Sequence, residues 1–79
     1  MPTYDYPRFE IETYRPNGVL LGRQRVTVQG SLRSELPYLA GEAIRRCRDE
    51  RGFTPTVRII NVSDIPGRGR QDETHLWLR

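Results

Sequence analysis

Residues 8–28, RFEIETYRPNGVLLGRQRVTV, decide the fold because they hold two strand patterns joined by a tight turn. Apolar and polar side chains alternate over residues 8–14, as in a half-buried strand. The next residues, Pro16-Asn17-Gly18, suit a three-residue hairpin loop with glycine in the left-handed conformation. A second strand is predicted over residues 19–29, so the chain begins with a β-hairpin.

The pairing of these two strands follows from the chemistry of the side chains that face each other. If the register ran without interruption, Phe9 would face Arg25 and an arginine would point into the core. One extra residue near Gly22, a usual place for a β-bulge, sets Phe9 opposite Val26 instead. The same shift places acids opposite arginines, and each match supports the other. The predicted pairs of opposite charge are Glu10 with Arg25 and Glu12 with Arg23.

The middle of the chain predicts one helix and a third strand. Apolar residues recur at helical spacing from Leu36 to Cys47 and form one stripe that can face a core. Ser34 is a suitable N-cap, and Gly52 can take the left-handed conformation that ends a helix. The segment 56–62 is rich in β-branched residues and predicts a strand.

The C-terminal part completes a small domain. Residues 65–73 contain proline and glycine and predict a loop, whereas residues 74–78 predict a short fourth strand. Residues 1–79 then form a single α+β domain in the order ββαββ, with one helix on one face of a four-stranded, mostly antiparallel sheet. Residues 1–7 are expected to form a flexible N-terminal extension. The arrangement resembles the ubiquitin-like β-grasp fold, which implies a last strand in mid-sheet beside the first.

Composition narrows the class of protein. The chain has 79 residues and a formal net charge of +3, and all 13 of its basic residues are arginine. Arginine suits phosphate, carboxylate and interface recognition, although a GC-rich genome produces the same bias. A single cysteine excludes an intrachain disulfide, and neither a secretion signal nor a membrane span is visible. We therefore expect a cytoplasmic protein without membrane contact.

Residues that carry catalysis or hold metal ions are too few for an active site. His75 is the only histidine, and Cys47, the only thiol, lies in the apolar stripe, where it is expected to pack rather than react. Asp72 and Glu73 lie near His75, but a solvated acidic loop is a simpler interpretation than a metal site. The sequence therefore predicts a protein that is not an enzyme and has no cofactor or metal.

Two surfaces are candidates for binding a partner. The first is the sheet face away from the helix, where aromatic and arginine side chains typical of binding hot spots are expected to gather. The second joins the outer face of the helix to the loop predicted at residues 65–73 and offers arginines to phosphates or to an acidic partner. The first predicted surface consists of Trp77, His75, Arg79, Tyr14 and Arg58. The second predicted surface consists of Arg45, Arg46, Arg48, Arg68 and Arg70.

Three classes of function are compatible with these surfaces. The primary prediction is a non-catalytic protein that docks the first surface onto a larger protein or nucleoprotein complex, because acids already match the strand arginines. The alternative is a small nucleic-acid-binding protein that contacts phosphates through arginines and stacks bases on Trp77. A subunit of a larger assembly is the third, and neither the partner nor the oligomeric state follows from the sequence.

The chain is also similar to a class of small viral proteins. It is one small α+β domain with a hairpin over residues 9–28, a helix over residues 36–47 and no catalytic or cofactor motif. In these features it resembles phage-encoded inhibitors of host machinery, anti-CRISPR proteins among them. The resemblance implies a cytoplasmic protein that blocks a nucleoprotein complex by occupying one of its surfaces.

Overall fold

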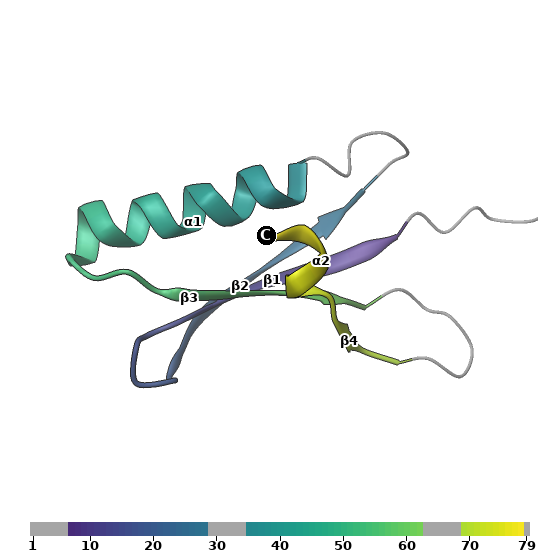
Figure 1. Cartoon of the computed structure of the whole chain (residues 1–79), viewed down its shortest axis with the longest axis horizontal. Helices are drawn as coiled ribbons and strands as arrows, with labels where there is room; N and C mark the ends of the chain where they lie inside the picture. Colours follow the sequence, from purple (N-terminus) through teal and green to yellow (C-terminus); the bar gives the residue numbers. More distant parts are fainter. Residues whose placement is uncertain (1–6, 29–34, 63–68, 79) are drawn as a thin grey trace, which may run out of the picture.

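The chain folds into one antiparallel sheet with both helices on the same face. The computed structural model describes residues 7–28, 35–62 and 69–78. Its elements are β1 (Arg8–Tyr14), β2 (Leu20–Thr27), α1 (Glu35–Arg51), β3 (Thr56–Asn61), β4 (Gln71–Asp72) and α2 (Thr74–Trp77). The strands lie in the order β2-β1-β3-β4, and both helices lie above one face of this sheet (Figure 1). The predicted α+β class is confirmed and the ββαββ order matches roughly, with β4 earlier in the chain than the predicted fourth strand and α2 added at the end.

The hairpin forms with the predicted bulge. Phe9 pairs with Val26, and the register shifts by one residue between Thr13 and Tyr14, beside Gly22. The shift keeps the apolar side chains of both strands on one face and the charged side chains on the other. The two predicted pairs of opposite charge are present, Glu10 facing Arg25 and Glu12 facing Arg23.

Glycines end both the hairpin loop and the long helix, as the sequence predicts. Gly18 has a φ of +91°, and the loop is closed by a hydrogen bond of 2.8 Å from the Arg15 N–H to the Val19 carbonyl. Gly52 has a φ of +79° and donates its N–H to the carbonyl of Arg48 at 3.1 Å. Both angles lie in the region that side chains disfavour, so glycine is the suitable residue at each site.

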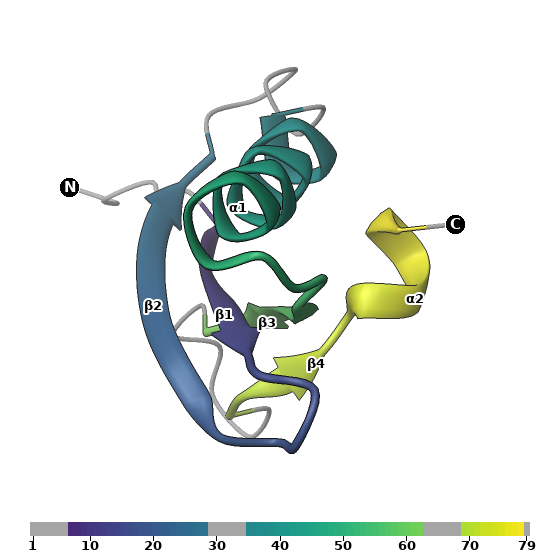
Figure 2. The same cartoon turned by 90° about the vertical axis from the view of Figure 1, so that its left-hand side faces the viewer.

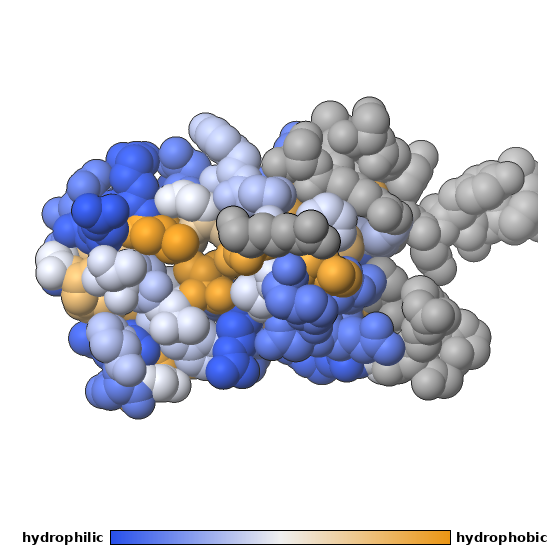
Figure 3. All heavy atoms as spheres, viewed as in Figure 1, coloured by the Kyte–Doolittle hydropathy of each residue, from blue (hydrophilic) through white to orange (hydrophobic). Residues whose placement is uncertain are grey.

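The core lies between α1 and the sheet. The predicted helix stripe faces it, with Leu36 and Ala40 fully buried and Cys47 nearly so. α1 packs mainly against β1 and β3. Apolar atoms follow the seam between α1 and the sheet, and polar atoms lie on both sides of it (Figure 3). The buried core consists of Phe9, Ile11, Val28, Leu36, Ala40, Val57 and Ile59.

The sheet order differs from the one that the β-grasp resemblance implies. The last strand does not lie in mid-sheet, because β3 pairs with β1 there and β4 forms an edge. β3 has six residues, three of them buried and apolar, whereas β4 has only two residues, both exposed and polar. A central strand must bury side chains, so only β3 can fill the position beside β1.

The C-terminal segment is helical where the sequence predicts a strand. Residues 74–77 form α2, and the short strand β4 lies within the segment predicted to be a loop. The Asp72 carboxylate explains the turn, since it accepts hydrogen bonds from the backbone N–H and the hydroxyl of Thr74, at 2.9 and 2.5 Å. An aspartate that binds the backbone two residues ahead favours a turn over an extended strand.

This helical turn places Trp77 on the core side of the sheet. The indole meets the ring of Phe9 edge to face, with centroids 5.8 Å apart and an interplanar angle of 81°. Its N–H donates to the Glu73 carboxylate at 3.2 Å, and the same carboxylate accepts a hydrogen bond of 2.9 Å from Asn61. Trp77 therefore extends the core, and its predicted place on the face away from the helix is wrong.

Replacing Trp77 with alanine is expected to destabilise the domain by about 2 kcal/mol, because the edge-to-face contact and buried apolar area are lost. Trp77→Phe keeps an aromatic ring against Phe9 and should lose less. Urea unfolding followed by circular dichroism measures both variants. An unchanged midpoint for Trp77→Ala would show that the indole contributes nothing to the core.

The stability of α2 is expected to depend on pH through Asp72. Hydrogen bonds from the Thr74 hydroxyl, and next from its backbone N–H, hold the pKa of Asp72 below its ordinary value of 3.8. A carboxyl whose pKa is lowered by folding stabilises the fold above its unfolded pKa, and this contribution is lost as pH falls through the folded pKa. α2 should therefore loosen in acid, below about pH 4.

The emission of Trp77, the only tryptophan in the chain, reports this loosening. We expect the emission of the wild type to shift to the red only in acid. Asp72→Ala should show a red-shifted emission already at neutral pH, because the turn before Thr74 has lost its acceptor. Identical emission of the two proteins from neutral pH to acid would contradict the role of Asp72.

Candidate functional site: an arginine-covered sheet face

The sheet face without helices carries two carboxylates on its central strand. Glu10 and Glu12 point to this face because their neighbours Phe9 and Ile11 point into the core. The two glutamates are nevertheless only 5% and 4% exposed. A buried carboxylate is tolerated when it is paired and hydrogen-bonded, so the groups that cover these two define the chemistry of this face.

Arginine and tyrosine side chains supply those partners. Arg70 bridges the two acids, donating from Nη1 to Glu10 and from Nη2 to Glu12 at 3.1 Å. Glu12 also accepts hydrogen bonds of 3.0 Å from Arg23 Nε and 2.8 Å from the hydroxyl of Tyr14. The bond to Glu12 raises the pKa of Tyr14, and the bond to Glu10 raises that of Arg70. Glu12 is therefore the centre of a hydrogen-bond network that joins β1, β2 and the segment before β4.

Two further arginines lie on this face without a carboxylate partner among the described residues. Arg25 faces Glu10 across the strands, but it makes no ion pair with any residue in 7–28, 35–62 or 69–78. Arg58 faces Glu12, and its guanidinium lies over the ring of Tyr14, 5.4 Å from the ring centre. We call this surface the arginine face. It consists of Arg23, Arg25, Arg58, Arg70 and Tyr14 above the buried Glu10 and Glu12.

The structure brings together only part of the first predicted surface. Tyr14 and Arg58 are in contact on the arginine face. His75 and Trp77 belong to α2, on the other side of the sheet, because the predicted last strand is a helical turn. Arg79 lies outside the described residues. The five residues therefore do not form one surface in the described structure, although a role in binding for each stays a prediction.

The second predicted surface is divided between the two sides of the sheet. Arg45 is held on α1 by Glu42 at 2.7 Å and Asp49 at 3.2 Å. Arg70 lies on the opposite face, on the buried glutamates, because those carboxylates attract it more strongly than solvent does. Arg68 lies outside the described residues. The remaining members, Arg46 and Arg48, are exposed on α1.

Sequence reasoning missed the arginines of β2 as site residues. The predicted pairs with Glu12 and Glu10 imply that Arg23 and Arg25 are neutralised, yet the side chain of Arg23 remains 53% exposed while that of Glu12 is 6% exposed. The useful signal is the position of the glutamates on a strand with neighbours on both sides, because long side chains of the adjacent strands can cover them. Arginines above such acids keep their outer surface open to a partner.

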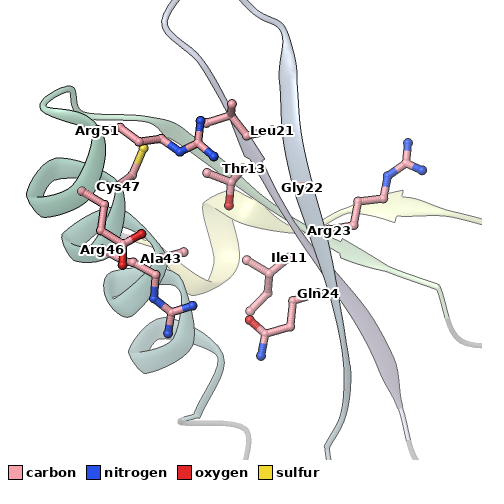
Figure 4. A pocket seen from close by; sticks show the side chains of 11 residues that line it. Ile11, Thr13, Leu21, Gly22, Arg23, Gln24, Ala43, Arg46, Cys47 and Arg51 are labelled. Carbon is pink, nitrogen blue, oxygen red and sulfur yellow. The ribbon is translucent and has the colours of Figure 1, made fainter.

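A groove separates α1 from β2 on the helix side of the sheet (Figure 4). Its volume is about 280 Å³. Arg46, Cys47 and Arg51 reach into it from α1, and Gln24 reaches into it from β2. Arg23 points away from the groove, toward the arginine face. The two sides of β2 therefore offer different chemistry, a groove on one side and guanidinium groups on the other.

The described residues include neither a metal site nor a membrane-spanning helix. No three His, Cys, Asp or Glu side chains in 7–28, 35–62 and 69–78 are placed to hold a metal ion. No helix in the same ranges is long and apolar enough to cross a membrane. Comparison of the chain with protein-family models, curated proteins and solved structures finds no match. The arginine face is therefore the feature from which a function is argued.

The network around Glu12 should be more important for stability than an ion pair on the helix surface. Glu12→Ala removes a buried acceptor of three hydrogen bonds, two of them from arginines, and should cost about 1–3 kcal/mol of unfolding free energy. The matched control is Glu42→Ala, which removes the same charge from the surface of α1 and should change the urea midpoint little. Equal midpoints for the two variants would contradict a stabilising network.

Proposed function

We propose that the protein is a non-catalytic binding protein that docks its arginine face onto an acidic surface of a larger protein or nucleoprotein complex. One observation carries the proposal: two buried carboxylates hold arginines over a sheet face that no described helix covers. Four arginines stand above two glutamates, so these six side chains carry a formal excess of two positive charges. This excess favours an acidic partner.

The geometry also lowers the cost of binding. The hydrogen bonds of Arg23 and Arg70 to Glu12 restrict both guanidinium groups before a partner arrives. Less side-chain freedom is then lost in the complex, which improves affinity. Arg58 and Tyr14 add a stacked pair of the residue types that dominate binding hot spots.

A surface of this kind suits an inhibitor that acts by occupying a site. The resemblance to phage-encoded inhibitors of host machinery, anti-CRISPR proteins among them, implies such a role, and the arginine face is the part of the chain that would perform it. A nucleoprotein complex offers both acidic protein and phosphate, and guanidinium groups bind either. We place this action in the cytoplasm, where such a complex would be met.

The nucleic-acid alternative has less support. Its stacking residue, Trp77, packs against Phe9 on the core side, and its second arginine group is divided between two faces. Single-strand binders combine a continuous cationic groove with open aromatic rings. On the arginine face the ring of Tyr14 is already covered by Arg58. We therefore favour a protein surface as the contact.

Affinity capture from a lysate of the natural host tests the proposal. The wild type is compared with Arg25→Ala/Arg58→Ala, which removes two charges from the arginine face, and with Arg45→Ala/Arg48→Ala, which removes two charges from α1. We expect a protein that is retained by the wild type and the α1 variant and released by the arginine-face variant. Its capture should survive nuclease treatment.

Two results would contradict the proposal. Equal retention by the arginine-face variant would show that the partner binds elsewhere. Loss of capture after nuclease, together with oligonucleotide binding that falls steeply with added salt, would favour the nucleic-acid alternative.

A further inference from the structure

The outer edge of β2 is open within the described part of the chain. β2 pairs with β1 along one edge, and no strand among the described residues pairs with its other edge (Figure 2). Edge strands of this length expose backbone donors and acceptors that can pair with another chain. What this edge can bind depends on which backbone groups of β2 point outward and which side chains lie beside them.

The direction of the backbone groups follows from one hydrogen bond. The Val28 N–H donates to the Pro7 carbonyl at 2.9 Å, so the backbone of Val28 points toward β1. In an antiparallel pair, successive residues alternate between the two edges. The backbone N–H and C=O groups of Thr27, Arg25 and Arg23 therefore point to the open edge. The side chains of both arginines lie on the arginine face.

We propose that this edge binds an extended acidic segment of the partner by strand addition. The added strand carries Asp or Glu at alternate positions, opposite Arg23 and Arg25, and small apolar residues between them. The inference rests on the proposed function, because it specifies which kind of segment of the partner binds to the arginine face and to the neighbouring edge of β2. Backbone hydrogen bonds supply affinity, and the alternating side chains supply specificity.

The protein contains an example of this pairing. On the inner edge of β2, the run Glu10-Ile11-Glu12 of β1 sets its two acids opposite Arg25 and Arg23. The apolar residue between them, Ile11, enters the core. An acid–apolar–acid segment on the outer edge would repeat this arrangement. Arg25 would then gain the carboxylate contact that no described residue provides.

The groove on the other side of β2 fits the residues between the acids. Side chains of the added strand that point away from the arginine face would lie toward this groove, with Gln24 on one wall and Ala43 and Cys47 on the other (Figure 4). Small apolar residues suit a groove of about 280 Å³. Arg46, Arg51 and Glu50 line the α1 wall and together carry an excess of one positive charge, which favours an acidic segment.

A second copy of this chain is a poor occupant of the same edge. Two β2 strands paired around Arg25 would place arginine opposite arginine on one face. Like charges directly opposite each other in a sheet are destabilising. Charge complementarity therefore selects an acidic strand over self-association.

Peptide binding tests the inference with a defined probe. A fluorescein-labelled peptide of alternating glutamate and valine is titrated with the full-length protein, and anisotropy is measured. A peptide of the same composition with glutamates and valines in two separate blocks is the control for charge alone. Arg25→Ala should weaken binding of the alternating peptide about fivefold. Arg48→Ala, which removes the same charge from α1, should change it less than about twofold.

Amide exchange measured by NMR tests the mode of binding. The peptide should slow exchange at the outward N–H groups of Arg23, Arg25 and Thr27. It should leave the N–H groups of Gln24 and Val26 unchanged, because these already bond to β1. Such a pattern arises only if a strand is added at the edge.

Each contrary result overturns the inference separately from the proposed function. Equal affinity for the block peptide, or binding without protection at Arg25 and Thr27, would mean that charge alone attracts the peptide to the arginine face. Absence of binding to the alternating peptide would also overturn strand addition. In each of these cases the capture experiment decides by itself whether the arginine face binds a partner.

Discussion

The fold depends on two carboxylates that are buried on the side of the sheet without helices. Glu10 and Glu12 lie on the central strand, and burial of a charge costs several kcal/mol unless hydrogen bonds and opposite charge compensate. Arg23 supplies a positive charge and a hydrogen bond from β2, and Arg70 supplies a positive charge and hydrogen bonds from the segment before β4. The network therefore links β1 to β2 on one flank and to the segment before β4 on the other. The helices secure one face by apolar packing, and this network secures the other.

The same constraint links structure to the proposed function. Arginines that must remain above buried acids are held in place, yet their outer surface stays open. Arg25 and Arg58 lie beside them without carboxylate partners in the described residues, so the face has more positive than negative charge. This excess of positive charge lies beside the outer edge of β2, whose backbone groups pair with no described strand. The proposed affinity for an acidic strand rests on this combination of fixed charge and available hydrogen-bonding groups.

Trp77 lies outside its predicted site because the sequence pattern around it fits both a strand and a helical turn. Leu76 and Leu78 alternate with His75 and Trp77, a pattern that fits a strand as well as a single helical turn. The Asp72 carboxylate favours the turn because it accepts a hydrogen bond from the Thr74 N–H. The turn brings the indole of Trp77 into contact with the ring of Phe9. The expected aromatic hot spot thus became part of the core. The stacked pair of Tyr14 and Arg58, which the prediction included, lies on the exposed face.

The sequence by itself determined the elements whose causes are local. Strand alternation and the loop at Gly18 set the hairpin and its bulge, helical spacing and Gly52 set α1, and β-branched residues set β3. Tertiary structure decided the place of β3 beside β1 and the position of Arg70 above Glu10, sixty residues away in the chain. No periodicity or turn signal encodes such a contact, because it depends on which buried charge a distant arginine can reach after the chain has folded.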